Sequence, residues 1–281
     1  MNGSIVDVNI NLSRWPCRRL PHDETASLVE NLRSHGVVEA WAGSFDGLLH
    51  KDLAAVNERL AHECRTHTGI RLIPFGSVNP LLPDWEEDLR RCVEQHHMPG
   101  IRVHPNYHGY KPDHPAFARL LKLAAERRLL VALAVIMEDE RVMHPLLRVP
   151  SVNLDPLPAL VTQTPGLRLI LLNALSGFSS PSRSPLPPGG KGQGEGNSRG
   201  ETLVTLVRSS EVYVEIAMLE RVGGVANLLN EVPLERILFG SYAPFFYFES
   251  ALLKLKESAL SAEQLKALQE DNARRLIASR Q

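Results

Sequence analysis

Three polar side chains alternate with aliphatic residues in the segment SIVDVNINL near the start of the chain. Asp7, Asn9 and Asn11 share one parity, which is typical of one face of a β-strand. Asp and Asn are depleted in strands because their side chains bond the local backbone and favour turns. A carboxylate and two amides on one face could bind a ligand or transfer protons. Alternatively, Asp7 is a buried, hydrogen-bonded carboxylate with a structural role.

Polar residues also lie at the ends of most other apolar runs. Imidazole, carboxylate and guanidinium groups are among them, and these could carry acid/base chemistry or bind an anion. The residues are Asn79 after RLIPFGSV, Arg102 and His104 in GIRVHP, Tyr107 and His108 just beyond it, Glu138 after LLVALAVIM, Asn173 in LRLILLNAL, Glu215 in VYVEIA, and Ser241 and Tyr242 at the end of RILFGS.

The elements that must position these residues are short apolar runs alternating with segments of helical periodicity. The predicted strands are 4–12, 37–43, 71–78, 100–105, 129–137, 167–175, 212–217 and 236–241. The helices between them are predicted at 23–36, 53–67, 83–96, 115–128, 156–164, 201–210 and 225–232, with two more at the carboxyl end. Asp84 with Glu87, and Ser261 with Gln264, have the spacing of capping boxes.

Eight strands, each followed by a helix, predict an α/β fold: a (β/α)8 TIM barrel with C-terminal helices, as a single domain over residues 1–281. Several strands are apolar on both faces, as a parallel sheet under a helical jacket requires. An open doubly wound sheet is the alternative, but no GxGxxG motif follows the first strand. In a barrel the carboxyl ends of the strands meet at one mouth, so the polar residues would converge there.

The segment from Ser179 to Gly200 interrupts this rhythm. It is rich in Gly, Pro and Ser and has almost nothing apolar to bury. It follows the sixth predicted strand, so a mobile lid over the barrel mouth is one interpretation. A disordered insertion over 179–200 is the interpretation that its biased composition favours.

Composition excludes several classes of partner. The formal net charge is −1 and the arginine pairs are scattered, which argues against nucleic acid. The longest apolar run, 129–137, is too short for a membrane span, and the amino terminus lacks the pattern of a signal peptide. Three cysteines without CxxC spacing suit a reducing compartment. We therefore expect a cytoplasmic protein whose partner is a small molecule, and which could form a homo-oligomer.

Five segments together resemble the amidohydrolase-related (amidohydrolase-2) family of the metal-dependent hydrolase superfamily. They are MPGIRVHP, RRLLVALAV, LRLILLNALSG, ERILFGSYAPF and EDNARRLI. The resemblance runs from the first strand to the last helix and implies a TIM barrel that hydrolyses small cyclic esters or amides, or decarboxylates small carboxylic acids. It also implies zinc or another divalent metal, which would lower the pKa of a bound water to about 7.

The sequence departs from this family at every metal-ligand position. The resemblance implies a His-x-His pair on the first strand, a histidine on each of strands five and six, and an aspartate on strand eight. The residues found at these positions are Asn9, Asn11, Ala134, Asn173 and Tyr242. Amides are poor replacements for imidazole on zinc, and alanine supplies no ligand. We therefore predict no metal at the family site and no cofactor.

Other residues could take over the chemistry. We assign proton transfer to Asp7, His104, Glu138 and Glu215. We assign substrate binding to Asn9, Asn11, Arg102, Tyr107, His108, Asn173 and Tyr242. Arg102 favours an anionic ligand and is also a possible partner for a buried Glu215. In the alternative interpretations, His104 caps its loop before Pro105, and the run of Glu138, Asp139, Glu140 and Arg141 is a salt-bridged loop.

Two functions from different classes remain open. One is a hydrolase acting on a C–N or C–O bond, or a related lyase, with a small and carboxylated substrate and a degenerate or absent metal site. The other is a catalytically inactive barrel that binds a small molecule or serves as a scaffold, in which the amides of Asn9, Asn11 and Asn173 only hydrogen-bond a ligand or one another.

Overall fold

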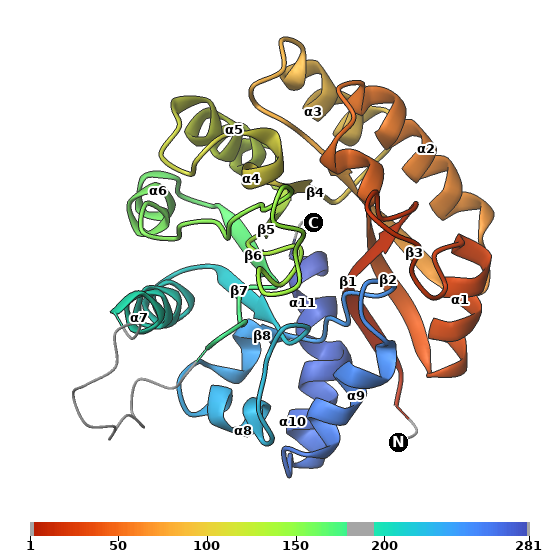
Figure 1. Ribbon diagram of the computed structural model, residues 1–281, viewed down its shortest axis with the longest axis vertical. Helices are drawn as coiled ribbons and strands as arrows, with labels where there is room; N and C mark the ends of the chain where they lie inside the picture. Colours follow the sequence, from red (N-terminus) through yellow and green to blue (C-terminus); the bar gives the residue numbers. More distant parts are fainter. Residues whose placement is uncertain (1–2, 179–193, 280–281) are drawn as a thin grey trace.

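The computed structural model of the protein describes residues 3–178 and 194–279. Within them, eight parallel strands pair in the order β1 to β8 (Figure 1). Hydrogen bonds from the segment after β8 to β1 complete the ring: the amide of Val8 donates to Phe239 O at 3.0 Å and that of Tyr242 to Asn9 O at 2.8 Å. The strands are β1 (Ile5–Leu12), β2 (Val37–Ser44), β3 (Arg71–Ser77), β4 (Gly100–Val103), β5 (Leu130–Ala134), β6 (Arg168–Leu172), β7 (Val212–Glu215) and β8 (Ile237–Leu238). The predicted (β/α)8 barrel is confirmed.

Helices surround the strands, and the last helix lies across the middle of the view in Figure 1. Those of the jacket are α1 (Thr25–Ser34), α2 (Leu53–Thr66), α3 (Trp85–Glu94), α5 (Pro115–Glu126), α6 (Leu157–Gln163), α7 (Gly194–Ser209), α8 (Gly224–Leu229) and α9 (Phe248–Lys256). Short elements are η1 (Phe45–Leu48), α4 (Pro105–His108) and η3 (Leu234–Arg236). The chain ends in α10 (Ala262–Lys266), the π-turn η4 (Ala267–Asp271) and α11 (Asn272–Ala278).

One of the two predicted capping boxes forms. Ser261 and Gln264 exchange their side-chain and backbone hydrogen bonds at the start of α10. Asp84 makes no side-chain cap at α3. Glu87 instead binds the guanidinium groups of Arg90 and Arg91, at 2.7 and 2.9 Å, because charged partners one turn away compete successfully for its carboxylate.

The insertion predicted at 179–200 is only partly described. Helix α7 begins at Gly194, so the last seven residues of that range lie in a helix. The helix is longer than its apolar pattern indicated, because the polar residues before Glu201 extend it by almost two turns. Residues 179–193 lie outside the described part of the chain.

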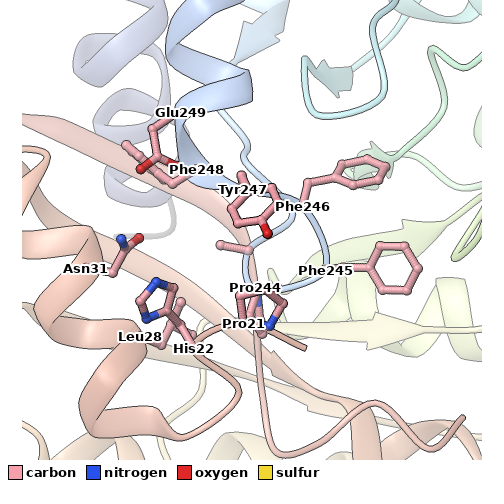
Figure 2. Close-up of a pocket in the computed structure, with 11 residues that line it drawn as sticks. Pro21, His22, Leu28, Asn31, Pro244, Phe245, Phe246, Tyr247, Phe248 and Glu249 are labelled. Carbon is pink, nitrogen blue, oxygen red and sulfur yellow. The ribbon is translucent and has the colours of Figure 1, made fainter. Parts of the chain in front are cut away.

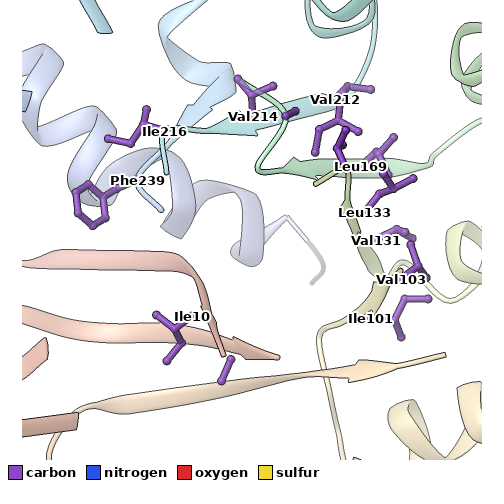
Figure 3. Packing of buried hydrophobic residues seen from close by; sticks show 14 of the residues in the cluster. Ile10, Ile101, Val103, Val131, Leu133, Leu169, Val212, Val214, Ile216 and Phe239 are labelled. Carbon is purple, nitrogen blue, oxygen red and sulfur yellow. The ribbon is translucent and has the colours of Figure 1, made fainter. Parts of the chain in front are cut away.

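Successive side chains along the strands point in opposite directions and pack into two different apolar cores. Figure 3 shows one of them, between the strands and the helices, with Ile101 and Val103 of β4 beside Val131 and Leu133 of β5. The other fills the barrel towards the amino ends of the strands, where Trp41 stacks on Phe75 with ring centroids 5.3 Å apart. Residues of α11 complete this inner core, so the amino end of the barrel is plugged by packed side chains.

A β-bulge interrupts the alternation in β1. Asp7 pairs with Ala40 and Ile10 with Ala42, so three steps along β1 match two steps along β2. Ala40 and Ala42 belong to the core under the helices, whereas Val8 belongs to the inner core. Consequently Asp7 faces away from the barrel interior, and the prediction that it shares a face with Asn9 and Asn11 is wrong. The extra residue of the bulge reverses the parity.

Two further findings concern the chain as a whole. In the described residues no helix is both long enough and apolar enough to cross a membrane. All three cysteines are free: Cys64 and Cys92 are buried and Cys17 is exposed. Burial raises the pKa of the Cys64 and Cys92 thiols to about 12, so both remain protonated at neutral pH.

Candidate functional site

A layer of polar side chains crosses the barrel at the carboxyl ends of its strands. We call it the polar layer, and its members are Asn9, Asn11, Ser77, Arg102, His104, Asn173 and Glu215. None of the seven is more than 2% exposed. The layer lies between the inner core and a set of aromatic rings above it. Since buried polar groups are costly unless they are paired, the partners of each side chain decide what it can do.

The acidic side of the layer is centred on Glu215. Its carboxylate accepts hydrogen bonds from the backbone amides of Asn173 and Ala217, both at 2.5 Å, and from Asn9 Nδ2 at 3.2 Å. A side chain at Gly240 would place its Cβ 2.5 Å from Glu215 Oε2, so only glycine fits there. Burial raises the pKa of Glu215, and its donors oppose that shift. Glu215 therefore joins β1, β6 and β7 as a hydrogen-bond acceptor.

Asp7 joins β1 to the segment after β8. Its Oδ1 accepts from the amide of Asn9 at 3.0 Å and from that of Ser241 at 3.1 Å, while Oδ2 accepts from Ser241 Oγ at 2.5 Å. Because of the bulge, the backbone N–H of Asn9 is not part of the regular hydrogen-bond ladder between β1 and β2. The carboxylate of Asp7 accepts its hydrogen bond instead. Desolvation by burial raises the pKa of Asp7 to about 7. The structural interpretation of this residue is supported.

This pKa gives a testable dependence of stability on pH. The folded protein holds the Asp7 proton up to a pKa of about 7, and the unfolded chain releases it near 3.8. The stabilisation is therefore complete below the unfolded pKa and is lost as the pH rises through the folded one. We expect Asp7→Asn, which cannot ionise, to gain about 3 kcal/mol relative to wild type between about pH 4.5 and about pH 8. Urea unfolding of both proteins across this range measures the difference, and a constant difference would contradict the assignment.

The basic side of the layer is centred on Arg102. Its Nη1 donates to Ile10 O at 3.1 Å and to Asn11 Oδ1 at 2.8 Å. No carboxylate lies within 4.0 Å of this guanidinium in the described residues, so the expected pairing of Arg102 with Glu215 is wrong. Asn9 and Asn11 lie between the two charges and each bonds to one of them. Burial lowers the pKa of Arg102 to about 10, so it still carries its charge at neutral pH.

Unpartnered polar atoms gather around Arg102. Six of the nine buried side-chain nitrogen and oxygen atoms that lack a hydrogen-bond partner in the described residues belong to five side chains at this side. These atoms are Asn11 Nδ2, Ser77 Oγ, Arg102 Nε, His104 Nδ1 and Nε2, and His108 Nδ1. Contacts join these residues, because Ser77 pairs with Arg102 across the β3–β4 ladder and the His104 and His108 rings lie 5.6 Å apart. We call these five residues the donor cluster.

The two histidines of the donor cluster are neutral. Burial lowers the pKa of His104 well below its usual range, and the charge of Arg102 adds to the shift. His108 donates from Nε2 to Gly47 O at 2.8 Å, which leaves Nδ1 as a free acceptor. His104 has no partner on either nitrogen and makes no cap for its loop. The interpretation of His104 as a loop cap is therefore wrong.

Aromatic rings close the barrel mouth above the polar layer. We call this group the aromatic plug, with members Trp15, Phe45, Tyr107, Tyr242, Phe245 and Phe246. Tyr242 lies in the segment after β8 and has a φ of +60°. Its hydroxyl donates a hydrogen bond to Met137 O, in the segment after β5, at 2.7 Å, so its side chain spans the barrel mouth. Its ring stacks on Phe245 at 4.9 Å, and Trp15 meets Phe245 edge to face at 5.0 Å.

The segment after β8 carries two rings of the plug. Figure 2 shows Phe245 and Phe246 on the side of this segment away from His22 and Asn31, which line a small cavity against α1. Beside the plug, a cavity of about 10 Å³ is lined by Tyr107, Ala134 and Met137, by His104, and by the rim residues Asn106 and Pro150. That volume suits one water molecule.

The remaining predicted site residues lie at the rim. Glu138 is mostly buried beside the plug, 3.8 Å from Arg18, and burial raises its pKa. Asp139 and Arg141 form an ion pair at 2.5 Å, as a salt-bridged loop would. Ser77 is a site residue that was not predicted, because Asn79 is the more evident polar residue at the end of the β3 segment. Parity with Phe75, which faces the interior, is the signal that would have found it.

The residues at the family's ligand positions do not fit a zinc ion. Asn173 Oδ1 is occupied by Asn9 Nδ2 at 2.9 Å, and Asn11 Oδ1 by Arg102. In the described residues no three His, Cys, Asp or Glu side chains are grouped as a metal site. A guanidinium beside the amides would also repel a cation. The donor set therefore disagrees with the metal that the resemblance implies.

Comparison with known proteins identifies relatives of the chain. Residues 18–278 match the family described as Amidohydrolase. Among solved structures, 2,6-dihydroxybenzoate decarboxylase from Rhizobium superposes with a TM-score of 0.71 at 15% identity, covering 99% of each chain. A dihydroxybenzoic acid decarboxylase from Polaromonas, with bound manganese and 2-nitroresorcinol, has a TM-score of 0.69 at 14% identity, covering 100% of this chain and 98% of that one. A search of curated protein sequences finds no match.

A third solved structure is that of a protein assigned as a hydrolase. A protein from Pseudomonas putida assigned as a 2-pyrone-4,6-dicarboxylic acid hydrolase has a TM-score of 0.66 at 19% identity, covering 98% of this chain and 97% of that one. Identities this low establish a common fold. The family match, by contrast, extends from the segment after β1 to the end of α11. The chain is therefore a member of the amidohydrolase-related (amidohydrolase-2) family.

Proposed function

We propose that the protein is a metal-independent enzyme that hydrolyses a small aromatic carboxylate at the donor cluster. The observation that carries this proposal is the buried guanidinium of Arg102, which no carboxylate neutralises within 4.0 Å in the described residues. A buried charge is costly unless it is paired. A ligand carboxylate would supply the missing partner, and the planar guanidinium matches it in a bidentate geometry.

The rest of the donor cluster supports an anionic ligand. Two donors near Arg102 have no partner in the described residues: Asn11 Nδ2 on β1, whose Oδ1 already binds Arg102, and Ser77 Oγ on the adjacent strand β3. An oxyanion that accepts from these groups and from Arg102 Nε would remove three unsatisfied polar groups at once. The solved relatives include enzymes named for dihydroxybenzoate and for 2-pyrone-4,6-dicarboxylic acid, and both of these molecules are small, flat and carboxylated.

His104 is the proton acceptor of the proposed reaction. Its neutral ring has a lone pair, and it borders a cavity that suits one water molecule. We propose that His104 takes a proton from this water while the oxygen attacks the carbonyl carbon of an ester or amide in the substrate. The tetrahedral intermediate then breaks the bond to the leaving oxygen or nitrogen, which receives that proton from His104. A carboxylate bound at Arg102 would raise the pKa of His104 and make it a stronger base, because it offsets the positive charge that now lowers that pKa.

A second candidate is a barrel that binds such a carboxylate without turning it over. Two observations favour it: Asp7 and Glu215 are both engaged by backbone amides, and the aromatic plug covers the donor cluster. In that case Asn9, Asn173 and Tyr242 only maintain the shape of the mouth. Binding would be retained and no product would form.

One experiment separates the two candidates. We suggest incubating the purified chain with 2-pyrone-4,6-dicarboxylate, whose ring ester can be hydrolysed, and following both heat of binding and product by chromatography. The heat of binding of 2,6-dihydroxybenzoate, which has no ester or amide bond, probes the carboxylate site alone. Turnover that His104→Gln reduces by about a hundredfold or more, with the affinity kept, supports the enzyme. Binding without product supports the second candidate, and the absence of both contradicts the proposed carboxylate site.

Metal removal gives an independent prediction. Since the polar layer offers amides and a guanidinium in place of a zinc site, we expect chelation with EDTA to leave carboxylate binding, any turnover and the melting temperature unchanged. Metal analysis of the untreated protein should give a zinc content far below one ion per chain. Stoichiometric metal whose removal abolishes binding would refute the metal-independent site.

A further inference from the structure

A large groove opens at the amino end of the barrel, opposite the polar layer. Its volume is about 930 Å³, within the range of small-molecule sites. It is bounded by the end of α2, the amino half of β3, the segment before β4 and the face of α11. The residues used below are Arg65, Arg71, Ile73, Pro74, Ile277 and Arg274.

The groove exists because β3 changes partners along its length. Residues Arg71 to Pro74 pair with β2, whereas only Phe75 to Ser77 pair with β4. The chain before Gly100 therefore diverges from β3 and leaves a wedge in the barrel wall. The proline at position 74 has no backbone N–H to donate, which suits the end of the unpaired stretch. The wedge is a consequence of strand register, so it is built into the fold.

The inner part of the groove is lined by apolar side chains, and its edge carries arginine side chains. Ile73, Pro74 and Ile277 supply aliphatic surface, and arginines come from three separate elements. Arg65 has no carboxylate within 4.0 Å in the described residues, so its charge is available. Arg71 binds Glu39 at 2.9 Å, and Arg274 binds Glu270 at 2.6 Å.

Glu39 is the only acidic residue in the described lining, and it is already engaged. It is 2% exposed and accepts from Trp41 Nε1 at 3.0 Å as well as from Arg71. Arg71 and Arg274 are each paired with a carboxylate, so among the arginines of the described lining Arg65 carries the charge that would attract a ligand anion. An apolar body of the ligand would cover the aliphatic surface within.

We propose that this groove binds a small amphipathic anion, with a flat apolar part between Pro74 and Ile277 and its charged group at Arg65 and Arg71. The site is separate from the donor cluster, because it lies at the other end of the barrel with the inner core between them. It would allow a second ligand to bind while the barrel mouth is occupied.

The test uses 8-anilinonaphthalene-1-sulfonate, an aromatic sulfonate that fluoresces when it is desolvated. We expect the wild-type chain to bind it saturably at one site, with energy transfer from the nearby Trp41. Arg65→Glu should weaken binding about tenfold, because it removes a charge-assisted contact and adds a repulsion. Arg208→Glu is the matched control, since Arg208 also lies exposed in the last turn of a helix. It should leave the affinity unchanged.

A second variant tests the cavity itself. Ala278→Trp should fill part of the groove and weaken binding by a similar factor, and circular dichroism would verify that both variants are folded. Three results would overturn the proposal: no saturable binding by the wild-type chain, equal weakening by Arg65→Glu and Arg208→Glu, or full affinity in both groove variants. The last would place the dye at another surface, such as the barrel mouth.

Discussion

Replacement of Arg102 by methionine should lower the affinity for a small aromatic carboxylate by about a hundredfold. Two charge-assisted hydrogen bonds from a buried guanidinium together contribute about 3 kcal/mol, which corresponds to that factor. The buried position makes the effect large, because water competes poorly for either partner. Isothermal titration with 2,6-dihydroxybenzoate, before and after the substitution, measures it directly.

Arg102→Lys and Arg168→Met provide the comparison. Lysine keeps the charge without the planar fork, so we expect an intermediate loss of about tenfold. Arg168 is also a buried strand arginine that donates to carbonyl oxygens, among them Leu276 O at 3.1 Å, but it lies at the amino end of β6. Its replacement should affect stability and not affinity. Equal affinity of wild type and Arg102→Met would remove the main support for a carboxylate at the donor cluster.

Glu215→Leu should destabilise the protein by about 3 to 5 kcal/mol, because three buried donors would lose their acceptor and each loss costs about 1 to 3 kcal/mol. The three are the backbone amides of Asn173 and Ala217 and the side-chain amide of Asn9. The two backbone amides cannot turn away, since they belong to the ends of β6 and β7. Equilibrium unfolding in urea measures the change in the free energy of unfolding.

Glu215→Gln separates hydrogen bonding from charge. Glutamine keeps an acceptor oxygen for the Asn173 amide and Asn9 Nδ2, but its Nε2 would face the donor of Ala217. We expect the glutamine variant to recover part of the lost stability. A change below about 1 kcal/mol in the leucine variant would mean that water replaces the carboxylate, and Glu215 would then regain its place as a candidate for catalysis.

The substitutions at Glu215 and Arg102 also test why the polar layer can hold a buried acid and a buried base that do not form an ion pair. Arg102 and Glu215 lie in one buried layer without touching, and amides of Asn9 and Asn11 stand between them. Direct pairing would have neutralised the guanidinium and left no reason for an anion to bind. The separation keeps the basic side free for a ligand while backbone amides satisfy the acid.

The fold could be predicted from the sequence because its signals are local. Alternating apolar runs and helical periodicity located all eight strands, and Pro115 at the first turn of α5 marked a helix start correctly. Boundaries were less accurate, as at β8, where RILFGS yields a strand of only two residues. The final three residues of that run lie beyond the strand and form the close approaches around Glu215 and Asp7.

The candidate site could be predicted only in part. Asn9, Asn11, Arg102, His104, Asn173 and Glu215 do meet in one layer, as residues at strand ends of a barrel must. The sequence could not reveal that Asp7 turns away from them, because a single-residue bulge depends on how β1 pairs with β2. Nor could it show that the hydroxyl of Tyr242 reaches across the mouth to Met137.

By itself, the sequence determined the barrel, its family and the residue types at the positions where the family resemblance implies metal ligands, because these depend on residue identity and on short-range periodicity. The tertiary structure alone decided which polar groups are engaged and which are free. Hydrogen-bond partners come from strands far apart in the chain, as with Glu215 and Asn9, so no local pattern encodes them. For the same reason, the sequence could not predict that Arg102 has no carboxylate partner in the described residues, or that a wedge opens beside β3. Both depend on how the strands pair in the folded barrel.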